Sequence, residues 1–131
     1  MGINPIIILI SIWSGTIIFF SAVVAPTVFK SLGEKEAGVF LRAFFPKYYI
    51  FGIILGALSI IYLLYNPVHS HLMYSVIAMT VLTLLGRMSI PIINNARDSG
   101  NEASFKRYHL ISVMMNVLTL VIGIVILGML L

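Results

Sequence analysis

The chain has 131 residues, of which 60% are hydrophobic and 9% are charged, and its mean hydropathy is +1.10. A soluble domain carries charge on about a quarter of its residues, so this composition excludes a soluble protein and predicts an integral membrane protein. Without cysteine the chain has no disulfide, thiolate metal site or cysteine nucleophile, and its net charge of +4 is divided between two short connections, which argues against binding to nucleic acid.

The first apolar run, residues 5–29, contains no charged side chain. It exceeds the roughly 20 residues that a helix needs to cross a bilayer core. Asn4 followed by Pro5 predicts the helix start, because the amide can cap free N–H groups and proline has no N–H to lose at the first helical position. Pro26 predicts a kink or an end in the last part of this span.

Residues 34–45 are predicted to form an amphipathic helix on the cytoplasmic surface of the membrane, between the first two spans. Ser31 and Glu34 have the spacing of a capping box, and apolar side chains recur at helical intervals through the segment while the charged ones lie elsewhere on the wheel. Pro46 disfavours the α conformation at Phe45, so we expect this surface helix to bend or break there before the second span begins.

Three further apolar segments are each long enough to cross a bilayer: residues 47–65, 70–93 and 108–131. Gly52 and Gly56 have the spacing that allows close helix packing in lipid. Ser99 and Glu102 repeat the capping-box spacing and predict the start of the fourth helix. Small and polar residues form a stripe on each span, which predicts an all-α, four-helix membrane bundle.

Charge predicts the orientation of this bundle. Every charged side chain lies in or around the connection between spans 1 and 2 or the connection between spans 3 and 4. Because cytoplasmic loops are enriched in Lys and Arg, both termini are expected outside and both charged connections in the cytoplasm. The pattern fits a multi-pass protein of the plasma membrane, in contact with anionic lipid.

Polar side chains predict a pocket near the inner leaflet. Arg87 lies within span 3, and antiparallel packing of the last two helices would bring it level with His109 and Asn116. Arginines with other donors suit an anionic group such as a lipid phosphate or a porphyrin propionate. The predicted ligand-binding residues are Arg42, Tyr49, Arg87, Asn94, His109 and Asn116.

A simpler interpretation explains the same residues without a ligand. Arg87 would extend to lipid phosphate, His109 would lie among head groups, and Asn116 would join two helices by a hydrogen bond. Arg42 would belong to an ordinary solvated face. No span contains Asp or Glu, which argues against a proton relay or a hard-cation site, and no nucleophile and base form an enzyme pattern, so an enzyme is not favoured.

Metal and haem binding depend mainly on His109. With Met114 or Met115 it could hold soft copper or an axial position of haem, since thioethers favour Cu(I). The alternative is that these methionines only fill space in an apolar helix. His69 and His71 lie in the opposite loop, where they are most simply loop residues.

Several motifs together resemble the transmembrane-protein-205-like family of small four-span membrane proteins. They are the Phe20–Phe29 run, the segment from Leu32 to Tyr49, Arg87 with Pro91 and Arg97, and Phe105 with His109 and Asn116. This family is similar to copper-resistance D-type and protoporphyrinogen-oxidase-like membrane proteins. The resemblance implies a four-helix bundle and a link to metals or haem, although this chain offers only one histidine near the bundle.

Three hypotheses for function remain open. The first is binding or transport of a small amphiphile or metal species through the inner-leaflet pocket. The second is a redox protein linked to haem or quinone, which rests on the resemblance and on His109. The third is a non-catalytic assembly subunit, in which an exposed face with Gly52 and Gly56 would form the interface of a homo-oligomer.

Overall fold

The computed structural model describes residues 4–67 and 70–131, and these are almost entirely helical. The elements are α1 (Pro5–Phe19), the π-helical turn η1 (Phe20–Val24), α2 (Ala25–Ser31), α3 (Glu34–Tyr65), α4 (Ser70–Asp98) and α5 (Glu102–Leu130). Because α1, η1 and α2 are continuous, they form one rod, and four rods are long and apolar enough to cross a membrane. The predicted all-α class is confirmed, and so is the presence of four helical rods long and apolar enough to span a membrane.

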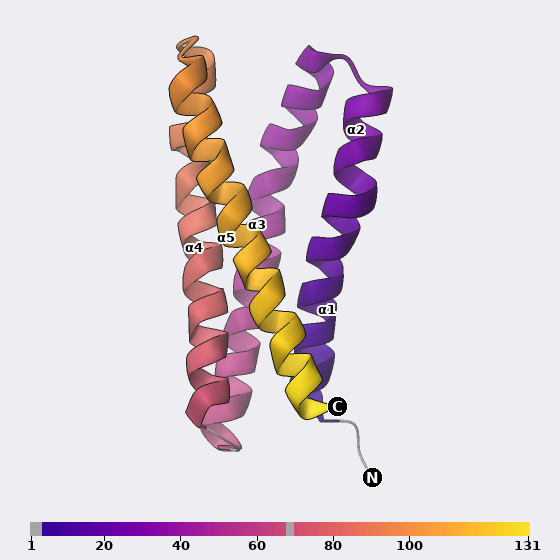
Figure 1. The fold of residues 1–131 in the computed structure, drawn as a ribbon, viewed down its shortest axis with the longest axis vertical. Helices are drawn as coiled ribbons and strands as arrows, with labels where there is room; N and C mark the ends of the chain where they lie inside the picture. The colour runs from indigo at the N-terminus through magenta and orange to yellow at the C-terminus, as the bar shows by residue number, and fades with distance from the viewer. Residues whose placement is uncertain (1–3, 68–69) are drawn as a thin grey trace.

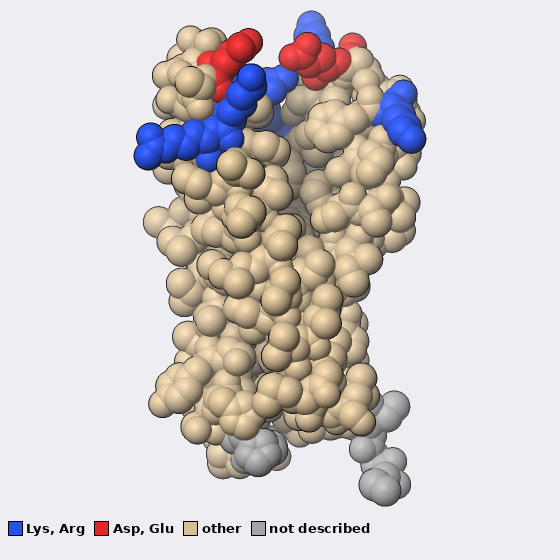
Figure 2. Space-filling view, in the orientation of Figure 1, with Lys and Arg blue, Asp and Glu red and all other residues tan. Residues whose placement is uncertain are grey.

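The rods form a ring in the order α1, α3, α4, α5, in which each packs on its two neighbours. Figure 1 shows α1 beginning and α5 ending at one end of the bundle, which we call the packed end. The turns at residues 32–33 and 99–101 lie at the other end. Figure 2 shows the Lys, Arg, Asp and Glu side chains gathered there, so we call it the charged end.

The packed end is held together by a tryptophan that lies against two glycines. Trp13 of α1 is 2% exposed, and its ring lies beside Gly52 and Gly56 of α3. A Cβ at Gly56 would come 2.9 Å from the Trp13 ring and would collide with the Thr80 hydroxyl of α4. The glycine pair therefore faces the interior, and the expectation that it forms an exposed interface between copies is wrong.

The charged end is open between two of the rods. No Cα atom of α2 lies within 8 Å of one in α4 or α5 among the described residues, although α1 packs directly on α5. Figure 1 shows α2 and α5 diverging from the middle of the bundle toward the charged end. The ring that is closed at the packed end is therefore open at the charged end.

Helix α3 differs from the prediction because it does not break at Phe45. It runs without interruption from Glu34 to Tyr65 and contains Pro46, so residues 34–45 extend the second span instead of forming a separate surface helix. Aromatic rings on both sides of the proline pack on Phe20, with centroids 5.1 Å away for Phe44 and 5.1 Å for Tyr48. This packing offsets the hydrogen bond that the proline cannot donate.

The first span shows the expected disturbance near Pro26 as a π turn. Pro26 has no N–H to donate to the carbonyl four residues earlier, and the wider turn η1 lies immediately before it in the chain. The span then continues to Ser31. Helix α4 continues beyond the predicted third span, to Asp98, and α5 begins at Glu102, in the segment that predicted the start of the fourth helix.

The observed N-cap residue agrees with the predicted one in α1 and differs from it in α3 and α5. Asn4 accepts from the Ile6 N–H at 3.1 Å, as predicted. Gly33 is the N-cap of α3, where the capping box predicted Ser31. Asn101 caps α5 by accepting from the Ser104 N–H at 3.1 Å, in place of the predicted Ser99. In both α3 and α5 the N-cap is thus the residue immediately before the first helical residue, and not the serine of the predicted capping box.

Candidate functional site

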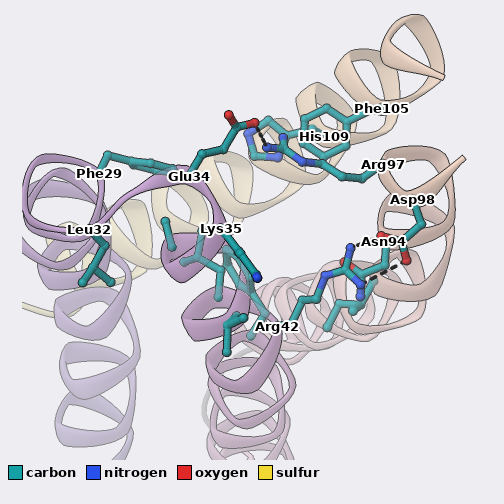
Figure 3. A pocket seen from close by; sticks show the side chains of 16 residues that line it. Phe29, Leu32, Glu34, Lys35, Arg42, Asn94, Arg97, Asp98, Phe105 and His109 are labelled. Atoms are coloured by element: carbon teal, nitrogen blue, oxygen red, sulfur yellow. Dashed lines mark hydrogen bonds and ion pairs between the residues drawn. The ribbon is translucent and has the colours of Figure 1, made fainter. Parts of the chain in front are cut away.

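A cavity of about 930 Å³ lies at the charged end, between α2 and α3 on one side and α4 and α5 on the other. Its lining combines apolar side chains with a group of charged and polar ones, and Figure 3 shows the residues that line it. The apolar side chains come from all four rods and from the turn after α2, and include Phe29 of α2, Leu32 of the turn, Leu41 and Phe45 of α3, Ile90 of α4 and Phe105 of α5. Its volume falls in the range of small-molecule sites, about 300–1,000 Å³.

Two ion pairs join α3 to α4 beside this cavity. Arg42 donates from Nη1 to Asp98 Oδ2 at 3.0 Å and also pairs Nη2 with Oδ1, which makes the contact bidentate. Arg97 donates from Nη2 to Glu34 Oε1 at 2.8 Å. All four side chains are largely exposed, so solvent and salt screen both pairs. The pairs close the ring between α3 and α4 on the side opposite the α2–α5 opening.

An arginine and two rings stack along the α5 side of the cavity. The Arg97 guanidinium carbon lies 4.7 Å from the centroid of the Phe105 ring, within the range of a cation–π contact. The His109 ring stacks on Phe105 with centroids 5.6 Å apart and planes 5° from parallel. The stack holds the Phe105 ring in the cavity lining, with the His109 ring beside it.

Lys35, like Arg97, is a cationic side chain of the cavity that was not among the predicted ligand-binding residues. It lies in the first turn of α3, and Figure 3 shows its ammonium group extending from α3 into the cavity. It takes part in neither ion pair, and it has no other hydrogen bond or ion pair within residues 4–67 and 70–131. The signal that could have identified it is its spacing of seven residues from Arg42, which places both on one face of a helix.

Three of the six predicted ligand-binding residues line the cavity. Arg42 comes from α3, Asn94 from α4 and His109 from α5, so the polar side chains approach the cavity from three helices. Tyr49 and Asn116 do not line it. They belong to a hydrogen-bonded layer deeper in the bundle.

The deeper layer connects α3 to α5 across the ring. The Tyr48 hydroxyl donates to Asn116 Oδ1 at 2.9 Å, and the Tyr49 and Ser112 hydroxyls lie 3.3 Å apart. Both tyrosines are buried. Asn116 therefore joins two helices, as the simpler interpretation of the sequence held, and its partner Tyr48 was not predicted.

Arg87 does not reach the cavity either. It is half-buried on α4, between the buried Gly86 and the exposed Met88. It makes no hydrogen bond or ion pair with any described residue. The predicted alignment of Arg87 with His109 and Asn116 into one pocket is not seen.

The predicted soft-metal ligands lie on different faces of α5. At 3.6 residues per turn, Met114 and Met115 are rotated by roughly 140° and 120° from His109, in opposite directions. Met114 is 60% exposed on the outer surface, whereas His109 lines the cavity. Within the described residues, no group of three or more His, Cys, Asp or Glu could hold a metal ion. His69 lies outside the described residues.

The sequence matches the family described as a domain of unknown function, DUF4149, over residues 8–102. The chain belongs to the DUF4149 family. A relative from Aquifex aeolicus (strain VF5), an uncharacterized protein, is 32% identical over 114 residues, covering 87% of this chain and 85% of its own. No solved structure matches. The DUF4149 match includes the α2, α3 and α4 sides of the cavity, whereas Phe105 and His109 lie beyond it.

Proposed function

We propose that this DUF4149 protein binds a membrane amphiphile in the cavity at its charged end. The observation that carries the proposal is the opening between α2 and α5, next to a cavity with apolar walls and a charged rim. A molecule with an apolar tail and a polar head has the matching distribution of chemistry. The tail can reach the lipid through the opening while the head remains among the charged side chains.

The amphiphile enters from the membrane and leaves by the same route. Phe29 of α2 is 66% exposed at the opening, and lipid tails solvate such a ring at little cost. Below the cavity, the Tyr48 and Tyr49 layer and the closed packed end obstruct passage through the bundle. The site therefore holds its ligand within one leaflet and is not a channel.

Charge sets the leaflet in this proposal. Lys and Arg are enriched in cytoplasmic loops, so the charged end faces the cytoplasm and both termini face outward. The ligand is then a constituent of the inner leaflet of the plasma membrane. A redox role receives less support, because His109 is the single histidine among the described residues that line the cavity.

A glycine in the cavity wall offers the test. Gly38 lines the cavity, and a Cβ added there would meet no atom within 4 Å, so Gly38→Leu would place a bulky side chain where the ligand is expected to lie. Gly15 on α1 is a matched control, because its Cβ position is equally open and it does not line the cavity. Both substitutions improve helix propensity.

The measurement is native mass spectrometry of protein released from nanodiscs, with dodecanoate as the added probe. We expect the wild type and Gly15→Leu to retain one bound amphiphile and Gly38→Leu to lose it. Equal retention by all three proteins would overturn the proposal, because the probe would then be bound elsewhere.

A further inference from the structure

The charged groups that line the cavity do not cancel. Three cationic side chains, Lys35, Arg42 and Arg97, face two carboxylates, Glu34 and Asp98. With His109 neutral, three positive charges and two negative ones leave a single positive charge. A ligand head with one negative charge would complement it.

The two guanidinium groups are already occupied. Arg42 uses both terminal nitrogens on the Asp98 carboxylate, which is the geometry of a strong arginine contact. Arg97 is bound to Glu34 on one side and lies over the Phe105 ring. Each arginine keeps further N–H donors, but its charge is already balanced by a carboxylate that would repel an incoming anion.

Lys35 needs no such exchange. Its ammonium extends into the cavity and pairs with neither carboxylate. An ammonium group is a compact point charge with three N–H donors, and it donates to a carboxylate or a phosphate oxygen without requiring a fixed planar geometry. The free positive charge of the cavity is therefore located on this side chain.

We infer that the bound amphiphile carries a head group with a single negative charge, and that Lys35 holds this head group. The inference rests on the proposed function and adds the class of ligand. Arg42 and Arg97, each neutralised by its own carboxylate, set an upper limit on the charge the site accepts. A head with two negative charges would lack a second free cation.

Four probes of the full-length protein in nanodiscs of zwitterionic lipid test this inference. Dodecanoate carries one negative charge, dodecanol none, and dodecyl phosphate two at a pH above about 7. Acetate carries the same charge as dodecanoate without a tail. We expect dodecanoate to bind at least about tenfold more tightly than dodecanol, and acetate not to bind.

Three variants test which side chain supplies the charge. Lys35→Gln should weaken the binding of dodecanoate by about tenfold and leave the binding of dodecanol unchanged. Lys106 is an exposed lysine outside the cavity, so Lys106→Gln should change neither affinity. Asp98→Asn releases Arg42 and should shift the preference toward dodecyl phosphate.

Each outcome decides one question. Equal affinities for dodecanol and dodecanoate, or an unchanged dodecanoate affinity in Lys35→Gln, would overturn the inference and leave the proposed function standing. Tight binding of acetate alone would show that the site takes a small soluble anion. Failure of every probe, together with no effect of Gly38→Leu, would overturn the proposed function itself.

Discussion

The packed end and the charged end of the bundle are built from the same four rods, but the rods pack much more closely at the packed end. At the packed end, Ile6, Ile10, Val76 and Met79 are completely buried, and two glycines let α3 approach Trp13. At the charged end, α2 separates from α5 and leaves Phe29 largely exposed. The difference shows how one small bundle can combine a closely packed half with a half that is open between two rods.

The largest effect is expected from filling the closest contact at the packed end. Gly56→Leu places a side chain against Thr80 and Trp13 and should destabilise the fold by about 1–3 kcal/mol. Gly38→Leu changes a residue of the same helix, but one that lines the open cavity, so it should not destabilise the fold. An SDS titration followed by the fluorescence of Trp13, the only tryptophan, measures both. Similar losses in the two variants would contradict the distinction between the ends.

A smaller effect is expected in the layer that separates the two ends. Tyr48→Phe removes the hydrogen bond to Asn116 and leaves the ring packing intact, so we expect a loss of about 0.6 kcal/mol, with an upper limit near 1.7. Tyr65, which is 83% exposed, supplies the control Tyr65→Phe. The same SDS titration compares the two, and equal midpoints would mean that the hydrogen bond does not stabilise the layer.

The smallest effect on stability is expected at the charged end. Arg42→Gln and Asp98→Asn, singly and together, should leave the SDS midpoint nearly unchanged, because both side chains are exposed and screened. They should instead widen the distance between α3 and α4, measured by electron spin resonance between labels at positions 39 and 95. High salt should widen the same distance in the wild type. If the variants widen it but high salt does not, the ion pair is not screened and this prediction is contradicted.

Much of the fold could be predicted from the sequence because hydropathy decides it. Apolar length gave four spans, and the absence of charge from their centres fixed which segments cross the membrane. The continuity of α3 through Pro46 could not be predicted. The local preference at Phe45 was outweighed by ring packing on Phe20, a residue 25 positions away in sequence, and only the fold brings the two together.

The site could be predicted less well, for a related reason. Arg42, Asn94 and His109 were found because polar residues near span ends are conspicuous. Arg87 and Asn116 were assigned to the same pocket by depth alone, although depth does not say which face of a helix meets which neighbour. Lys35 was interpreted only as a topology signal, because its seven-residue spacing from Arg42 becomes informative only once both lie on one continuous helix that faces the cavity.

Photo-crosslinking tests the central claim most directly, that the charged end binds an amphiphile through the opening between α2 and α5. Dodecanoate with a diazirine in its tail would be activated in nanodiscs and the labelled peptides identified by mass spectrometry. We predict labels in residues 29–32, at the end of α2 and in the turn after it, and in residues 105–109 of α5, and we predict their loss in Gly38→Leu. Even labelling of lipid-facing positions such as Ile77 and Val81, unchanged by Gly38→Leu, would contradict the claim.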